Sequence, residues 1–212
     1  MTLIFSRLIA MAQLNLLDGV GPSDSITTDI YDYRPRIFSK AESELLRTKI
    51  IADTSWVQRR VMMYGKEVIT PRLTAWHGDI AGGRQAEDKT FMHAWTPELL
   101  VIREKVQKLA GVTFDSVLLN YYRDGNDSVA WHDDQDGRPG KNMLVASVSL
   151  GQERRFDIRR KSDHSDKMSV LLEDGSYILM KGRFQDDWEH RIAKSSKPMA
   201  ARINLTFRIT PK

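Results

Sequence analysis

Cysteine is absent from this chain of 212 residues. Its absence excludes disulfides, thiolate metal sites and cysteine nucleophiles, so any bound metal must have nitrogen and oxygen ligands. No apolar stretch is long enough to span a bilayer, and we expect no membrane partner. Residues 1–10 are weakly similar to a signal peptide, but Arg7 interrupts the apolar run and no small-residue cleavage region follows.

A large charge excess is also missing, since 32 Lys and Arg residues against 28 Asp and Glu residues leave a net charge of +4. That balance permits a polyanionic partner without requiring one. The length suits one domain with a substantial core. We expect residues 1–25 to form a weakly ordered extension, with Met11 as a candidate start, and residues 26–212 to form a single, monomeric domain.

Two helices are predicted in the first half of the chain. Ser39 and Glu42 have the spacing of a capping box and predict a helix over residues 40–52. Pro97 occupies a typical first helical position, apolar residues follow at helical spacing, and Gly111 ends the run.

Short β-prone runs separated by turn residues dominate the second half. The predicted strands are residues 116–122, 143–150, 155–160, 169–172, 177–180 and 202–209. An earlier hairpin is predicted over residues 61–69, with its turn at 64–66. This order favours a mainly β fold with flanking helices: a double-stranded β-helix (jelly roll) core, N-terminal helices and a projecting hairpin.

His132, Asp134 and His190 are the candidate metal ligands. Residues two apart in a strand point to the same side, so His132 and Asp134 can direct an imidazole and a carboxylate at one point. His190 on a distant strand would supply the third ligand. Two histidines and one carboxylate form the facial triad of non-haem Fe(II) oxygenases. We expect no iron at the other histidines: His77, His93 and His164.

The last predicted strand alternates between apolar and polar side chains. Its apolar face would carry Ile203, Leu205, Phe207 and Ile209, and its polar face Arg202, Asn204, Thr206 and Arg208. A polar face is costly in an empty core, so we expect it to line a site for an anionic ligand. The alternative is a strand with one solvated face.

The arginines of this strand suggest a dicarboxylate keto acid. Arg202 can bind its distal carboxylate through a bidentate guanidinium fork. Arg208 lies roughly 20 Å further along an extended strand, so we place it at the iron end, on the keto-acid carboxylate or the substrate loop. Asn120 and Tyr122 share a strand face and can donate hydrogen bonds to the same molecule, although a satisfied polar pair in a barrel is equally typical.

Taken together, five segments resemble the AlkB family of Fe(II)/2-oxoglutarate-dependent dioxygenases, which repair alkylated nucleic acids: residues 120–125, 131–134, 146–151, 187–190 and 202–208. Residues 71–78 are similar to the segment that precedes the substrate lid in that family. The resemblance runs from about residue 60 to the C-terminus. The resemblance is greatest to the branch that contains the two human repair homologues. Residues 127–132 are more similar to the homologue that prefers single-stranded substrates.

This resemblance implies specific roles. The implied iron ligands are His132, Asp134 and His190, and the implied cosubstrate contacts are Asn120, Tyr122, Arg202, Asn204, Thr206 and Arg208. The implied substrate contacts are Asp136, Arg72, Trp76 and the hairpin tip of Met63, Tyr64 and Gly65. Fe(II), 2-oxoglutarate and O2 are the implied cofactor and cosubstrates.

Two positions depart from the family pattern. Residues 81–89 replace the usual aromatic lid, so the aromatic that stacks on the flipped base has three candidates: Trp76, Phe91 and Trp95. Gln135 stands directly after the ligand Asp134, where close relatives carry an acid. A different base preference can follow from that change.

The implied reaction is oxidative demethylation of bases such as 1-methyladenine and 3-methylcytosine in single- or double-stranded DNA, with release of formaldehyde and succinate. One alternative is an RNA or tRNA demethylase. Another is a 2-oxoglutarate-dependent hydroxylase of a protein or small molecule. The last is a non-catalytic nucleic-acid-binding domain, which the intact triad and arginines disfavour. We expect a cytoplasmic protein, associated with the nucleoid if the host is bacterial.

Overall fold

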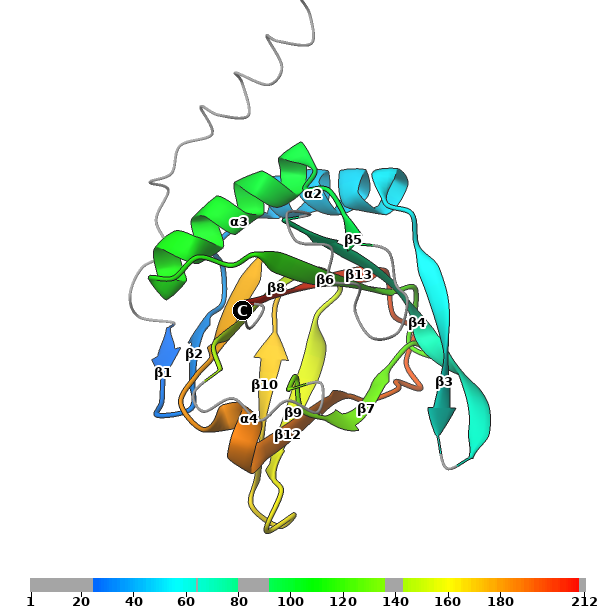
Figure 1. The fold of residues 1–212 in the computed structure, drawn as a ribbon, viewed down its shortest axis with the longest axis vertical. Coiled ribbons are helices and arrows are strands. Elements are labelled where there is room, and N and C mark those ends of the chain that lie inside the picture. Colours follow the sequence, from blue (N-terminus) through cyan, green and yellow to red (C-terminus); the bar gives the residue numbers. More distant parts are fainter. Residues whose placement is uncertain (1–24, 64, 80–91, 136–142, 210–212) are drawn as a thin grey trace, which may run out of the picture.

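Two mainly antiparallel sheets face each other, and two helices cover the outer side of the larger sheet (Figure 1). The computed structural model describes residues 25–63, 65–79, 92–135 and 143–209. Within these ranges the larger sheet has the strand order β1-β2-β11-β8-β13-β6-β4-β3, with β5 paired to β4, and the smaller sheet has the order β10-β9-β12-β7. The mainly β jelly-roll fold predicted from the sequence is confirmed.

The strands of the larger sheet are β1 (Ile26–Thr27), β2 (Tyr31–Arg34), β3 (Val57–Met63), β4 (Lys66–Gly78), β5 (Met92–His93), β6 (Ser116–Tyr122), β8 (Val145–Gly151), β11 (Ser176–Met180) and β13 (Arg202–Arg208). Those of the smaller sheet are β7 (Val129–His132), β9 (Arg154–Arg160), β10 (Lys167–Leu172) and β12 (Trp188–Ile192). The helices are α2 (Lys40–Asp53), α3 (Pro97–Ala110) and α4 (Phe184–Asp187).

Local sequence signals set both long helices. The Ser39 hydroxyl accepts from the backbone N–H of Glu42, and the Glu42 carboxylate accepts from the backbone N–H of Ser39, which confirms the predicted capping box. Pro97 begins α3, and Gly111 ends it in the left-handed conformation, with φ 70°. No helix among the described residues is long and apolar enough to cross a membrane.

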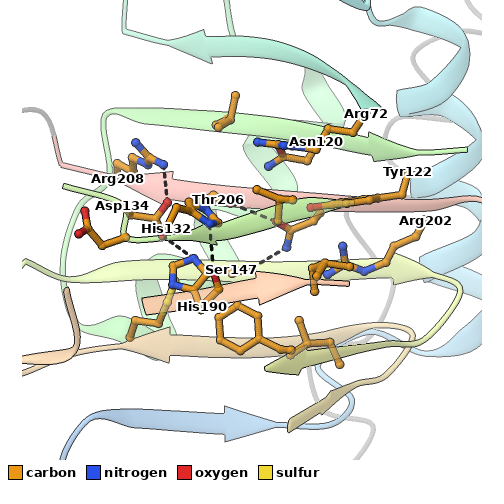
Figure 2. Close-up of a pocket in the computed structure, with 18 of the residues that line it drawn as sticks. Arg72, Asn120, Tyr122, His132, Asp134, Ser147, His190, Arg202, Thr206 and Arg208 are labelled. Carbon is orange, nitrogen blue, oxygen red and sulfur yellow. Dashed lines mark hydrogen bonds and ion pairs between the residues drawn. The ribbon is translucent and has the colours of Figure 1, made fainter. Parts of the chain in front are cut away.

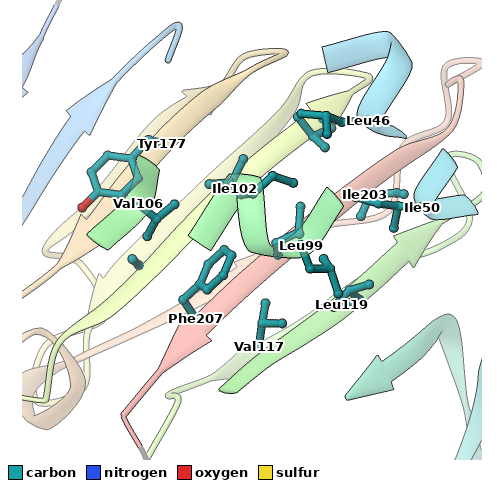
Figure 3. Packing of buried hydrophobic residues seen from close by; sticks show 14 of the residues in the cluster. Leu46, Ile50, Leu99, Ile102, Val106, Val117, Leu119, Tyr177, Ile203 and Phe207 are labelled. Carbon is teal, nitrogen blue, oxygen red and sulfur yellow. The ribbon is translucent and has the colours of Figure 1, made fainter. Parts of the chain in front are cut away.

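The apolar faces of α2 and α3 pack on the larger sheet (Figure 3). The helices contribute Leu46, Ile50, Leu99, Ile102 and Val106, and the sheet contributes Val117, Leu119, Ile203, Leu205 and Phe207. Each such side chain stabilises the fold by about 1.5–3 kcal/mol when fully buried. One face of the larger sheet is thus buried against the helices, and its opposite face lies toward the smaller sheet.

Strand β13 lies at the centre of the larger sheet, between β6 and β8. The register pairs Arg202 with Tyr122 and Asn204 with Asn120. Period two then places the polar side chains of β13 and β6 on the side away from the helices. The strand ends at Arg208, one residue earlier than predicted, and Ile209 is 41% exposed rather than part of the apolar face.

Several short elements were given no predicted bounds: β1, β2, β5, β7, α4 and β12. Of these, only a strand at His132 and a distant strand at His190 were expected. The brevity of the elements explains this, since two to five residues provide little periodicity. In β12 the side chains alternate between buried and partly exposed positions, as expected of a half-buried strand, but its 5 residues are too few for a clear pattern in the sequence. The predicted hairpin is confirmed and is longer than expected, extending over β3 and β4 with Gly65 at φ 73° in the turn.

Candidate active site

His132, Asp134 and His190 converge between the two sheets (Figure 2). One ligand atom from each residue lies within 4.8 Å of the others. His132 at the end of β7 pairs with His190 on β12, which brings the ring centroids to 4.3 Å. The Asp134 carboxylate then lies 3.6 Å from Nε2 of His190. Among the described residues this is the one group of three potential metal ligands.

The route of Asp134 to this point differs from the prediction. Strand β7 ends at His132, so Asp134 and His132 do not occupy two positions of one strand. The chain bends at Asp134 instead, and its backbone N–H donates to Oε1 of Gln185 at 2.8 Å. The predicted convergence of His132 and Asp134 is confirmed, but its predicted cause, alternation along one strand, is wrong.

Hydrogen bonds orient the His132 ring. Its Nδ1 lies 2.9 Å from the carbonyl of Ala130 and 3.0 Å from the carbonyl of His190. Since carbonyls only accept, this network assigns the proton to Nδ1 and leaves the Nε2 lone pair for a metal. Burial lowers the pKa of His190 to about 3, so the His190 ring is neutral at neutral pH and able to ligate.

Asp134 is buried and paired with Arg208, whose Nη2 donates to Oδ1 at 2.6 Å. Burial acts to raise the pKa of Asp134, but the positive charge of Arg208, and to a smaller extent that of Arg72, outweighs it and lowers the pKa. The carboxylate is therefore ionised at neutral pH. The structure thus places Arg208 at the iron end, where it contacts the carboxylate of the triad.

A cavity of about 180 Å³ adjoins the triad and is lined by side chains of both sheets. A single water needs only about 10–15 Å³. All six predicted cosubstrate residues line this cavity: Asn120, Tyr122, Arg202, Asn204, Thr206 and Arg208. The polar face of β13 therefore lines an internal site rather than a solvated surface.

Arg202 is the buried cation at the far end of the cavity. It is 1% exposed, and its Nη2 donates to Oγ of Ser149 at 2.9 Å. Its Nε and Nη1 are buried with no hydrogen-bond partner within the described ranges. Burial lowers its pKa to about 10, so it stays charged at neutral pH. Two buried guanidinium nitrogens without a hydrogen-bond partner are costly, and a carboxylate in the cavity would satisfy them.

The neighbouring polar side chains are already held in place. Asn204 donates through Nδ2 to Oγ of Ser147 at 2.5 Å and to the carbonyl of Val148 at 3.2 Å, and it accepts from Thr206. Oδ1 of Asn120 accepts from Nε of Arg72 at 2.7 Å, so Nδ2 is the group of Asn120 that can donate to a ligand.

The predicted substrate contacts divide into three groups. Arg72 and Trp76, both on β4, line the cavity, and the guanidinium of Arg208 lies 5.3 Å from the Trp76 ring centroid. Met63 ends β3 and Gly65 lies in the hairpin turn. The remaining residues of this prediction, Tyr64, Asp136 and the candidate aromatic Phe91, lie outside the described residues.

Trp95, the third candidate for base stacking, is on the wrong side of the sheet. Its ring stacks on Phe207 at 6.3 Å within the helix-side core, and its Nε1 donates to Asp79. It does not line the cavity, so the prediction that it could stack on a base is wrong.

The three remaining histidines have other surroundings, and none belongs to a potential metal group among the described residues. Nδ1 of His77 contacts the carbonyl of Ala94, and its ring lies 5.3 Å from that of His93. His164 lies 3.6 Å from a carboxylate oxygen of Glu189.

Sequence reasoning missed several residues of the site: Arg59, Ser147, Ser149, Lys161 and Gln185. A signal existed for the serines, because they alternate with apolar residues along β8 as the polar residues of β13 do. No local pattern indicated Gln185 or Lys161, since their contacts depend on segments far apart in the chain.

A metal triad beside a cavity that ends in an unpaired arginine is the arrangement expected of a 2-oxoglutarate-dependent oxygenase. The model of the 2OG-Fe(II) oxygenase superfamily matches residues 32–208. The chain belongs to this superfamily. Membership implies Fe(II), 2-oxoglutarate and O2, and the ligand set and the unpaired Arg202 nitrogens fit that requirement.

Curated relatives place this oxygenase within the AlkB family, as the sequence suggested. It is 31% identical over 182 residues to alpha-ketoglutarate-dependent dioxygenase alkB homolog 3 of Rattus norvegicus, covering 82% of this chain and 62% of the relative. It is also 31% identical over 183 residues to DNA oxidative demethylase ALKBH2 of Homo sapiens, covering 81% of this chain and 70% of the relative. The chain thus spans about six-tenths of the length of the first of these relatives.

The solved structure of OsALKBH1 superposes with a TM-score of 0.62, covering 87% of this chain and 99% of that one. Sequence identity between the two is 15%, so this likeness shows the fold alone.

Proposed function

We propose that this oxygenase removes N-methyl groups from bases such as 1-methyladenine and 3-methylcytosine in DNA, with release of formaldehyde and succinate. The observation that carries the proposal is Arg202, whose Nε and Nη1 have no partner among the described residues, at one end of a cavity whose other end holds the triad. Similarity to relatives named as an alkB homolog and a DNA oxidative demethylase supports the substrate class.

The residues of the site divide the work between them. His132, Asp134 and His190 would hold Fe(II), and Arg202 would bind the distal carboxylate of 2-oxoglutarate. Iron with 2-oxoglutarate and O2 supplies the oxidation of the N-methyl group. Arg208 keeps the Asp134 carboxylate ionised and oriented, so that it can ligate across the working pH range.

The substrate side of the site is formed by β3 and β4. Arg59 and Arg72 line the cavity and add positive charge where a nucleotide would enter. The hairpin of these two strands projects from the body of the molecule (Figure 1), and Met62 near its tip is 70% exposed. A base must leave its stack to reach the triad, which costs a few kcal/mol and least for a lesion that blocks pairing.

Anaerobic reconstitution with Fe(II) and 2-oxoglutarate, followed by oxygen and a methylated oligonucleotide, tests this proposal. Single-stranded DNA, duplex DNA and RNA carrying 1-methyladenine or 3-methylcytosine are compared by formaldehyde release. We expect release with DNA in the native protein and none in His132→Ala, which lacks a ligand. Retained turnover in His132→Ala, or no formaldehyde from any DNA, would overturn the proposal, and release from RNA alone would identify an RNA demethylase.

A further inference from the structure

The loop that carries Asp134 is held in place by polar contacts at three consecutive residues. Asp133 accepts from Nζ of Lys161 at 2.6 Å, and the backbone N–H of Asp134 donates to Gln185 at 2.8 Å. Nε2 of Gln135 donates to Oδ1 of Asp186 at 2.6 Å. The partners are Lys161, which directly follows β9, and two residues of α4, all more than 20 residues away in sequence.

Gln185 makes the central one of these three contacts, the one to Asp134. Its side chain is 1% exposed, and its Oε1 is the acceptor for the only backbone donor of Asp134. Its Nε2 lies 3.6 Å from the sulfur of Met180, which keeps the amide from rotating freely. A buried amide N–H without a partner costs about 1–3 kcal/mol, so Gln185 selects the bent conformation of the loop.

Lys161 ties the same two segments from the other side. Nζ donates both to the Asp133 carboxylate and to the backbone carbonyl of Gln185, at 2.6 and 2.8 Å. Its side chain is 33% exposed, and that of Asp133 is 29% exposed. The ammonium group therefore bridges the ligand loop and α4 directly, with no intervening residue.

Helix α4 runs without a break into β12, which carries His190. The ring of Phe184 also lies 5.7 Å from the ring of His190. One short element is thus covalently joined to one ligand and hydrogen-bonded to the backbone of another. Any shift of α4 would change the distance between Asp134 and His190, now 3.6 Å between Oδ2 and Nε2.

We propose that Gln185 and Lys161 are positioning residues that hold the Asp134 loop in its metal-binding conformation before iron arrives. Neither residue donates a ligand. Both act through the backbone and flanking side chain of the loop, so their loss weakens metal binding without removing a ligand atom. Partners of this kind typically change metal affinity by about 10- to 100-fold.

Metal titration tests the proposal without nucleic acid, so its outcome is independent of whether DNA is the substrate. Co(II) is added to the metal-free protein, and its ligand-field absorption gives both affinity and coordination geometry. For Gln185→Leu, which keeps the volume and removes the acceptor, we expect Co(II) to bind about 10- to 100-fold more weakly with an altered spectrum.

Lys161 offers a variant at a partly exposed side chain, with a matched control next to it. Lys161→Gln breaks the bridge, and Lys161→Arg keeps a cation that can reach Asp133. Arg160→Gln removes the ion pair with Asp166 at 2.7 Å and the contact of the guanidinium with the Trp188 ring at 4.3 Å, neither of which involves the Asp134 loop. We expect weaker Co(II) binding in Lys161→Gln, recovery in Lys161→Arg and native affinity in Arg160→Gln.

Native Co(II) affinity and spectrum in Lys161→Gln would overturn the role of Lys161, and the same result in a folded Gln185→Leu would overturn that of Gln185. Equal losses in Lys161→Gln and Arg160→Gln would show a general electrostatic effect and would also overturn the proposal. If Gln185→Leu does not fold, the Lys161 series decides.

Discussion

Replacing Arg202 by methionine separates a ligand-binding arginine from a structural one. Arg202 is buried with two nitrogens unpaired among the described residues, so the metal-free, ligand-free protein carries the cost of an unsatisfied cation. Methionine fills similar volume without charge. We therefore expect Arg202→Met to leave the free energy of unfolding of the ligand-free protein unchanged or to raise it.

The same change should abolish stabilisation by 2-oxoglutarate. Two charge-assisted hydrogen bonds at about 1.5–3 kcal/mol each sum to about 3–6 kcal/mol. At 1.36 kcal/mol per factor of ten, affinity falls by roughly 10²- to 10⁴-fold. A ligand at 100 times its Kd stabilises the native protein by about 2.7 kcal/mol. The same concentration would then stabilise the variant by about 0.4 kcal/mol or less.

Thermal unfolding with Mn(II) in place of iron, with and without 2-oxoglutarate, measures this difference. A stabilisation of about 2.7 kcal/mol corresponds to roughly 5–11 °C in a chain of this size. We expect that shift in the native protein and roughly 2 °C or less in Arg202→Met. A full shift in the variant would refute the reasoning that the unpaired nitrogens receive the cosubstrate.

Arg154 provides the matched control, because it is also buried but fully engaged. Its guanidinium donates to the backbone carbonyls of Asp124, Asp127 and Ala193. Arg154→Met leaves these acceptors unpaired at about 1–3 kcal/mol each. We expect a lower unfolding temperature without ligand but a retained 2-oxoglutarate shift, the opposite of Arg202→Met. Similar behaviour of both variants would contradict the distinction.

Two further predictions concern the triad. The folded-state pKa of His190, about 3, lies below the value of about 6.5 in the unfolded chain, so the unfolded state binds more protons between these values. The free energy of unfolding of the metal-free protein should therefore fall as the pH falls from about 6.5 toward 3. In His190→Gln, denaturant titrations should show that the free energy of unfolding depends less on pH. An equal pH dependence in both proteins would argue against a buried neutral imidazole. Arg208→Gln removes one partner of a buried pair and should lower the free energy of unfolding by about 3–5 kcal/mol, measured by urea titration without metal. An unchanged urea midpoint would show that Asp134 does not depend on Arg208.

The elements that could be predicted are those with a local cause. The Ser39 capping box, Pro97 and Gly111 define their helices through bonds within a few residues, and the structure reproduces them. Strand β6 matches its predicted bounds, and β13 differs by one residue, because alternation over seven residues is a strong signal.

The elements that could not be predicted depend on distant partners. The bend at Asp134 is held by Gln185, which is 51 residues away in sequence. Trp95 lies on the helix side of the larger sheet because α3 packs there. The residues next to Trp95 in sequence do not indicate this side. Nε and Nη1 of Arg202 are buried without a partner among the described residues because β13 pairs with both β6 and β8, which no local stretch of sequence shows.

Residue types, their spacing and the family resemblance together predicted the three candidate ligand residues, the polar face of the last strand and the oxygenase class, because iron and a dicarboxylate accept few kinds of ligand. Only the folded chain shows how the ligands converge. Asp134 reaches the metal position through a bend rather than along a strand, and α4 links it to His190. Hydrogen bonds between distant segments decide that arrangement, and their energies depend on geometry that no local stretch of sequence contains.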